Sequence, residues 1–402
     1  MHNFGTIYRY EIKKLVHRKL FWIMAFLCVI GIGIVSFAGL MGTYYVDGNP
    51  VESNYNAFCK DRAYRQAISG RYIDQALLRE TVDGYSHVPT DVLRYSLTEE
   101  YETYARPYSM IFNLIRSWTG MDLSAVQNWE AEEGALYEAR TKRLEDRWQS
   151  IPLSETEKEF WRTQESRMDT PFVYYYHEGY ENILNSLQTV GILMLLFTAV
   201  CVSNLFADEH LRRTDQLVLS SIAGRKTAYQ AKILAGVTVS GAAAAGMALL
   251  NIGLNLGYYG AEGFAVPVQV YDSMCSYPIT VGQACLIAYG VLIAASVAAA
   301  VFAMVISEFF RSGTAALAVS AGLIILGNMV RIPTQYRAVS QIWDWSPMVY
   351  LSAKNVLDPR TLTLFGQCFA SWQVVPVLYI LVSLIFAIAG AYIYQRYQVS
   401  GR

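Results

Sequence analysis

Residues 182–232 read NILNSLQTVGILMLLFTAVCVSNLFADEHLRRTDQLVLSSIAGRKTAYQAK. The first half, 182–207, has no charged side chain and is longer than the about 20 apolar residues that a helix needs to cross a bilayer. The second half, 208–232, is a short polar loop that holds an acidic pair, a basic pair and a Gly-Arg-Lys turn. Another apolar run starts directly after it. The stretch therefore predicts two membrane-spanning helices that are joined by a small loop at the membrane surface.

The whole chain has the composition of a protein that lies largely in lipid. Hydrophobic residues make up 53% of the 402 residues and charged residues only 16%, which is more apolar than a soluble domain usually is. Charge-free runs occur at 21–42, 182–207, 233–261, 273–307, 312–330 and 361–395. The sequence thus predicts an all-α membrane protein with six transmembrane helices. Pro278 and Pro376 are expected to break the fourth and the last run, which are longer than one span requires.

Basic residues set the expected orientation. Lys and Arg gather in 1–20 and in the loop 208–232, and cytoplasmic loops of membrane proteins are rich in these residues. We therefore expect 1–20 to form a cytoplasmic amphipathic helix and both termini of this multi-pass plasma-membrane protein to be cytoplasmic. Residues 233–402 then hold the third to sixth spans, with an external loop at 331–371. The run 21–42 is longer than the ~7–15 residues of a signal-peptide core, so we expect the first span to stay attached.

Residues 43–181 are expected to form a large, mostly helical extracytoplasmic domain. Their composition changes to mixed-charge and Tyr-rich sequence, and the segment is long enough to fold as a domain. Ser154 followed by Glu157 is a capping-box pattern, which predicts that a helix begins there. The helix that leads into the second span is expected to start at 169–171, and the tyrosines at 174–176 are expected in an aromatic belt at the outer membrane face.

The sequence lacks the patterns of common catalytic and metal sites. It contains neither a GxxxxGK[ST] phosphate-binding loop nor a GxSxG elbow. His177 and Glu181 have the spacing of half a zinc-protease helix, but the second ligand is Glu and not His, so an exposed polar turn is the better explanation. We expect no enzyme activity, no metal and no directly bound cofactor. The net charge of −1 also disfavours nucleic acid binding.

The six cysteines are spread along the chain without a CxxC pair. Most are interpreted as small apolar fillers. Cys59 and Cys275 both fall in external segments of the expected topology, so a disulfide between them is an open alternative.

Polar side chains inside the expected spans have two explanations. None is an Asp, Glu, Lys or Arg near a midplane, which disfavours an ion-coupled carrier. The candidates for a translocation path are Gln188, Asn251, Asn255 and Asn328. Hydrogen bonds between neighbouring helices are the alternative explanation for these amides, and the favoured one for most of them.

The loop 208–232 has the features of a docking element. Thr214 can cap a short helix over 215–222, and Gly224 can end that helix in the left-handed conformation. Leu217 and Val218 would then be apolar contacts for a partner protein.

Charged residues flank this predicted helix. Asp208 and Glu209 are placed to pair with basic residues of a partner, and Arg225 can reach phosphate or carboxylate groups at the membrane surface. The predicted partner-contact residues are Asp208, Glu209, Thr214, Leu217, Val218, Gly224 and Arg225.

With these features the sequence resembles the permease subunit of ABC type-2 exporters. The positions that carry the resemblance are Glu209, Arg213-Thr214, Leu217-Val218-Leu219-Ser220, Gly224-Arg225 and Lys232. Arg213 departs from the pattern, since Gly is commoner there. The likeness extends over the six-span plan, the basic amphipathic start and the large first external loop.

The resemblance implies a complex of two permeases, alike or different, with two separate ABC ATPase subunits. ATP and Mg would bind to the ATPase subunit, and the loop 208–232 would be the coupling helix that lies in a groove of that subunit. Residues 271–278 and 343–347 would be external gate elements. The chain would be a transport subunit of an exporter and not an enzyme. The alternative is a membrane-anchored extracytoplasmic binding or sensor protein that uses 43–181.

Overall fold

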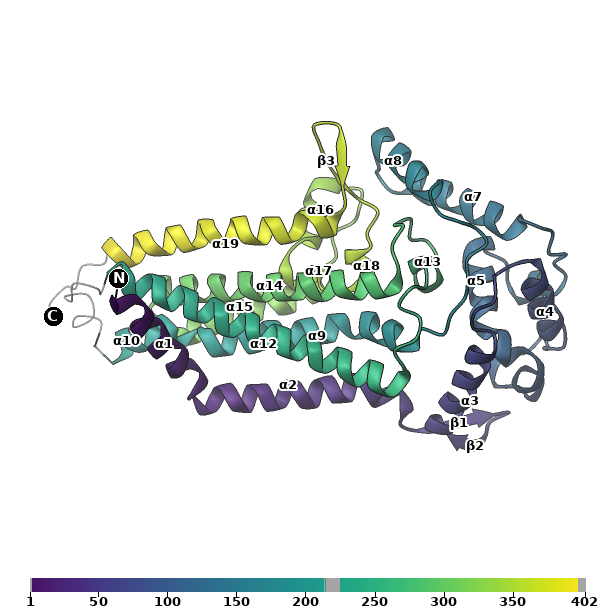
Figure 1. Ribbon diagram of the computed structural model, residues 1–402, viewed down its shortest axis with the longest axis horizontal. Coiled ribbons are helices and arrows are strands. Elements are labelled where there is room, and N and C mark those ends of the chain that lie inside the picture. Colours follow the sequence, from purple (N-terminus) through teal and green to yellow (C-terminus); the bar gives the residue numbers. More distant parts are fainter. Residues whose placement is uncertain (1, 213, 215–224, 397–402) are drawn as a thin grey trace.

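The computed structural model describes residues 2–212, 214 and 225–396. The chain is mostly helical, and Figure 1 shows two parts: a bundle of long helices and a smaller domain at one end of it. This inserted domain lies between the first and second long helices of the chain. Helix α1 and the last described residues of α19 lie at the opposite end of the bundle. We refer to the two ends of the bundle as the domain end and the terminal end.

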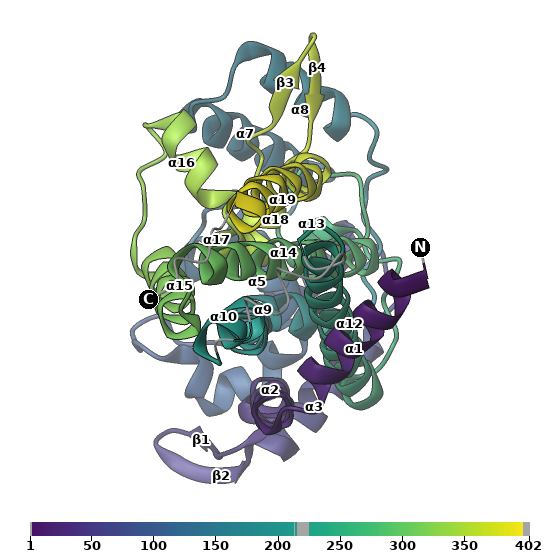
Figure 2. The same cartoon turned by 90° about the vertical axis from the view of Figure 1, so that its left-hand side faces the viewer.

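Six long helices form the bundle. They are α2 (Lys19–Phe37), α9 (Glu178–Val202), α12 (Thr227–Tyr259), α14 (Val281–Phe310), α15 (Gly313–Met329) and α19 (Ser371–Arg396). Helix α14 is central and packs on α9, α12, α15 and α19, as the end-on view in Figure 2 shows. Many large apolar side chains on α2, α15 and α19 are exposed, as expected of helix faces that contact lipid.

Five segments are long and apolar enough to cross a membrane. They are Lys19–Leu40, Glu178–Leu211, Thr227–Tyr259, Val281–Phe310 and Ser371–Arg396. The first includes η1 (Ala38–Leu40), and the second continues through α10 (Asn204–Leu211), beyond the expected end at 207. The sixth predicted run forms α15, whose 17 residues span only about 26 Å, against about 30 Å of hydrocarbon. The prediction of an all-α membrane protein is thus supported, with five spanning candidates and one shorter apolar helix among the described residues.

The two prolines that were expected to interrupt long runs differ in their effect. Pro278 lies in the loop before α14, which begins with a capping box of Thr280 and Gln283. Pro376 lies inside α19, and the helix continues through it, so the expected break there is wrong. The proline removes one backbone hydrogen bond, to the carbonyl of Trp372 in the first turn, and membrane helices tolerate such a loss.

The predicted N-terminal amphipathic helix is α1 (His2–Val16). It packs along α12 at the terminal end of the bundle. Leu15 and Glu11 are buried, and the Tyr8 hydroxyl donates to Thr238 Oγ1 at 2.9 Å. Helix α1 is therefore part of the bundle's packing.

The inserted domain starts with an antiparallel hairpin of β1 (Thr43–Val46) and β2 (Asn49–Ser53). Asp47 and Gly48 form its turn with φ values of 47° and 77°, the left-handed region that a two-residue hairpin turn needs. Its helices are α3 (Asn54–Ala67), α4 (Gln75–Ser86), η2 (Tyr95–Leu97), η3 (Tyr101–Ala105), η4 (Arg106–Tyr108), α5 (Ser109–Thr119), α6 (Leu123–Gln127), α7 (Ala135–Ser150) and α8 (Glu155–Glu165). The predicted capping box at the start of α8 is present.

The chain enters α9 by a route that the sequence did not predict. Residues 169–171 do not start a helix; instead, residues 172–174 pair in extended conformation with residues 70–73 through backbone hydrogen bonds. This pairing uses backbone N–H and C=O groups that would otherwise form the hydrogen bonds of a helix. Tyr174 and Tyr176 are fully buried, so the expectation of an exposed aromatic belt is wrong for these two side chains.

Shorter elements at the domain end connect the long helices. They are α13 (Val268–Tyr271), α16 (Arg337–Asp344), α17 (Pro347–Tyr350), α18 (Ala353–Val356) and a hairpin of β3 (Leu362–Leu364) and β4 (Gln367–Phe369). Helix α17 packs on α9, α14 and α15.

All six cysteines lie within the described residues and are free. Cys59 is exposed on α3, whereas Cys275 is buried beside α7, whose Arg140 Nη2 donates to the Cys275 carbonyl at 3.0 Å. The disulfide considered between Cys59 and Cys275 is therefore absent.

Candidate functional site

A buried ion pair lies at the base of the 208–232 loop. Glu209 Oε1 is 2.5 Å from Lys232 Nζ, and Lys232 is only 1% exposed. The contact is an ion pair without good hydrogen-bond geometry. The ammonium group also lies 5.0 Å from the centre of the Phe206 ring, which is a cation–π contact. Removing either charge would leave the other buried and unpaired, which costs about 3–5 kcal/mol.

The residues on either side of Glu209 contact other parts of the bundle. Asp208 Oδ2 accepts from Arg18 Nη2 at 2.5 Å, which connects α10 to the linker between α1 and α2. His210 Nε2 is 3.1 Å from Glu308 Oε2 near the end of α14, where Glu308 is buried. We refer to Arg18, Asp208, Glu209, His210, Lys232 and Glu308 as the loop-base network. Three consecutive residues of α10 thus contact three separate elements.

Asp208 and Glu209 were expected to pair with a partner's basic residues. In the structure both pair within the chain. The fold brings Arg18 and Lys232 to them from other parts of the sequence. Glu209 is buried, so its carboxylate would be costly to leave unpaired. They hold the base of the loop to the bundle.

The other predicted loop residues are only partly described. Leu217, Val218 and Gly224 lie outside the described residues. The backbone N–H of Thr214 donates to the Glu209 carbonyl at 3.0 Å. Arg225 is exposed, and its Nη1 donates to the Gln395 carbonyl at 3.4 Å, so it reaches the end of α19.

Two of the four translocation-path candidates are buried between helices. Asn251 Oδ1 accepts from Tyr289 Oη at 2.7 Å and from Ser186 Oγ at 3.2 Å. Asn255 Nδ2 donates to Ser36 Oγ at 3.2 Å. Both asparagines are 0% exposed. They connect α12 to α14, α9 and α2 by hydrogen bonds between helices, of the kind that the sequence favours for most of these amides.

The other two candidates, Gln188 and Asn328, contact each other. Gln188 Nε2 donates to Asn328 Oδ1 at 3.0 Å, which connects α9 to α15. Gln188 is exposed and Asn328 half-buried. The four residues therefore form two separate groups and not one continuous polar surface.

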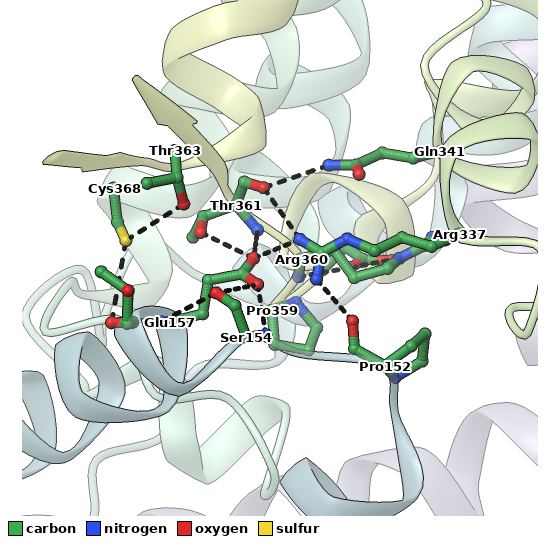
Figure 3. Close-up of polar contacts among 12 residues, drawn as sticks. Pro152, Ser154, Glu157, Arg337, Gln341, Pro359, Arg360, Thr361, Thr363 and Cys368 are labelled. Carbon is green, nitrogen blue, oxygen red and sulfur yellow. Dashed lines mark hydrogen bonds and ion pairs between the residues drawn. The ribbon is translucent and has the colours of Figure 1, made fainter. Parts of the chain in front are cut away.

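Another polar centre joins the inserted domain to the loop between α15 and α19 (Figure 3). It is built on Glu157 of α8, whose side chain is fully buried. Its Oε1 accepts from Arg337 Nη2 at 2.6 Å and from the Thr361 N–H and hydroxyl at 2.9 Å each. Its Oε2 accepts from the Ser154 N–H at 2.8 Å and hydroxyl at 2.9 Å. We call Ser154, Glu157, Arg337 and Thr361 the domain clamp.

The clamp favours the ionised form of its carboxylate. Burial alone would raise the pKa of Glu157, but the hydrogen bonds from Arg337, Ser154 and Thr361 outweigh it, so the pKa lies below the ordinary value of Glu. Five donors to one carboxylate make this a strong charge-assisted contact.

Arg360 extends the clamp toward α16. Its Nη2 lies 2.6 Å from both Asp344 Oδ2 and Asp358 Oδ2. The neighbouring Pro359 carbonyl accepts from the indole N–H of Trp161 on α8 at 2.9 Å. Asp344 belongs to 343–347, one of the two expected gate segments, so α8 is connected to that segment.

The second expected gate segment, 271–278, also contacts the inserted domain. The Trp118 indole N–H of α5 donates to the Ser273 carbonyl at 2.9 Å. Arg147 Nη1 of α7 donates to the Met274 carbonyl at 2.9 Å. One domain thus holds both segments at the domain end of the bundle.

Sequence reasoning missed most of these partners. Glu157 was recognised only as a local helix cap, because Ser154 lies three residues away, and nothing in the sequence connects it to Arg337 or Thr361. Glu308 was the one residue whose position in the sequence indicated a buried ion pair. It lies near the end of a long apolar run, and a charge at such a position often has a buried partner.

Comparisons with known proteins identify no relative. No protein-family model matches the chain. No curated protein and no solved structure matches it either.

Proposed function

We propose that this chain is the membrane-spanning permease subunit of an ATP-driven ABC type-2 exporter. Its loop 208–232 would contact a separate ATP-binding subunit. The proposal starts from the resemblance of this loop to the coupling segment of that family.

The loop-base network is the observation that supports the proposal best. A loop that receives force from a motor must pass the displacement to the helices, which requires stiff contacts at its base. Asp208, Glu209 and His210 contact Arg18, Lys232 and Glu308, so movement of α10 acts on three elements at once. The pair of Glu209 and Lys232 is buried and resists separation.

In this proposal the terminal end is cytoplasmic and the inserted domain is extracytoplasmic. Five spans and the shorter α15 make up the six-helix permease unit, which assembles with a second permease, alike or different. ATP-driven closure of the ATPase subunits would displace the loop, and the bundle would open a path outward. The inserted domain would hold 271–278 and 343–347 at the outer end of that path.

The experiment is a gentle purification of the tagged full-length chain from its native membranes, followed by mass spectrometry. We expect a stoichiometric protein that carries a GxxxxGK[ST] loop. Repeated recovery without such a protein would overturn the proposal and would favour a membrane-anchored sensor that acts through its inserted domain.

A matched pair of variants tests the loop itself. Leu217→Asp places a charge on the apolar face expected to contact the ATPase, and Leu93→Asp makes the same change at a 98% exposed site in the inserted domain. We expect only Leu217→Asp to reduce the recovery of the ATPase. Equal recovery with both variants would show that the loop is not the contact.

A further inference from the structure

An apolar cleft lies inside the bundle between α14, α15 and α19. Its volume is about 330 Å³. Ala299 and Phe302 of α14, Ile324 of α15, and Leu378 and Phe386 of α19 are among its lining residues. Helices α15 and α19 flank α14 in the end-on view (Figure 2). These positions fall near the middle of each helix, so the cleft lies at the depth of the hydrocarbon core.

Helices α16 and α17 close the cleft toward the domain end. Ile342, Trp345 and Met348 from this part of the chain line it. The Tyr379 hydroxyl of α19 donates to the Trp345 carbonyl at 2.8 Å, which attaches this cover to α19. Met348 also lies against Gly327 of α15, where an added Cβ would come within 2.4 Å of Met348 Cγ.

The hydroxyl groups of the lining leave little capacity for a polar ligand. The Ser383 hydroxyl donates to the Tyr379 carbonyl at 2.6 Å, and the Ser346 hydroxyl donates to the Trp343 carbonyl at 2.6 Å. Among the lining hydroxyls, all in described residues, only Ser320 Oγ has no hydrogen-bond partner. No lining residue carries a charge. A polar or ionic ligand would lose its hydration here without compensation, whereas a hydrocarbon chain would not.

Two lining residues that are themselves exposed indicate where such a chain comes from. Ile342 is 73% exposed and Val382, near the middle of α19, is 45% exposed. In a membrane Val382 contacts lipid, so bilayer acyl chains border the cleft. Its volume is near the lower end of the ~300–1,000 Å³ of small-ligand pockets, which suits one chain and excludes a bulky headgroup.

We propose that this cleft binds one acyl chain of a bilayer phospholipid, with the chain lying between α15 and α19 against α14. Filling the cleft restores the dispersion contacts that an unfilled apolar wall would lose. This inference does not depend on the transport proposal, because it needs neither ATP nor a partner subunit.

The test uses the full-length chain in phosphatidylcholine vesicles that contain a trace of phosphatidylcholine with a diazirine near the middle of one acyl chain. After irradiation, mass spectrometry of peptides maps the label. We expect label on 298–302 and 378–386 well above that on other lipid-facing segments such as α2. Label spread evenly over all lipid-facing helices would overturn the proposal.

Two Ala→Phe variants provide the matched comparison. Ala299→Phe fills part of the cleft, and Ala242→Phe adds the same bulk at an exposed site on α12. We expect Ala299→Phe to reduce label on 378–386 by about tenfold relative to Ala242→Phe, since this corresponds to excluding roughly two methylene groups. Equal labelling in the two variants would contradict the proposal. If Ala299→Phe does not fold, the distribution of label over the wild-type chain is sufficient to test the proposal.

A second copy of the chain is the competing occupant. In that case the wild-type label would avoid 378–386, and a Ser383→Cys variant would form a disulfide-linked dimer under mild oxidation. These two results together would show that a neighbouring subunit, and not a lipid, occupies the cleft, and would overturn the proposal.

Discussion

Replacing Glu157 by Gln should loosen the inserted domain from the helix bundle. The substitution removes the charge from a fully buried carboxylate that accepts five hydrogen bonds from Arg337, Thr361 and Ser154. Breaking a buried ion pair by removing one partner costs about 3–5 kcal/mol. Because Gln keeps one acceptor oxygen and Arg337 is partly exposed, we expect a loss of about 3 kcal/mol.

Thermal unfolding of the purified full-length chain in detergent measures this loss. The matched control is Glu159→Gln on the same helix. Glu159 is 72% exposed and, among the described residues, pairs only with Arg162 nearby, a contact worth less than about 1 kcal/mol. Cys368 provides a local readout, since its Sγ lies 3.9 Å from the Thr156 carbonyl beside the clamp. In a Cys59→Ser background, which removes the exposed cysteine, Glu157→Gln should speed thiol labelling of Cys368.

A double-mutant cycle decides whether the clamp acts as a unit. If Glu157 and Arg337 stabilise each other, Arg337→Gln should cost much less in the Glu157→Gln background than in the wild type. Additive effects, or equal unfolding and Cys368 labelling in Glu157→Gln and Glu159→Gln, would refute the reasoning.

The same contact predicts a pH dependence. The pKa of Glu157 is lowered in the folded chain, so its stabilising contribution is fully present above the ordinary Glu pKa of about 4.3. The contribution is lost as the pH falls through the lowered folded pKa. The difference in stability between wild type and Glu157→Gln should therefore be large at neutral pH and disappear in acid.

Two further comparisons test the interior of the bundle. Glu209→Gln leaves Lys232 buried without its counter-charge and should destabilise the chain by about 3 kcal/mol. Asp208→Asn, at a partly exposed pair, should cost less than about 1 kcal/mol. If thermal unfolding in detergent shows the larger loss for Asp208→Asn, the Glu209–Lys232 pair is not the stronger contact of the two. Asn251→Leu should destabilise the chain by about 1–2 kcal/mol because it breaks hydrogen bonds between helices, whereas Gln188→Leu should have little effect. If Asn251→Leu unfolds like the wild type, Asn251 does not stabilise the packing of the helices.

The candidate site was less predictable than the helices. The acidic pair at 208–209 was recognised as important, but its partners were assigned to another protein. Arg18 lies 190 positions from Asp208 in the sequence, so no local pattern could connect them. The capping box at Ser154 was predicted correctly because its two members are three residues apart, yet the other oxygen of Glu157 contacts Thr361, which is 204 positions away.

The sequence alone determined that this is a helical membrane protein and where its long helices lie. A run of apolar residues must satisfy its own backbone hydrogen bonds in lipid, and only local helix formation does so. The tertiary structure alone decided which polar groups meet. It placed Asn251 and Asn255 in hydrogen bonds between helices, buried Tyr174 and Tyr176, and brought Glu157 to Arg337. Such pairings depend on how distant elements pack, and the hydrophobic pattern of each element carries no information about its partner's side chains.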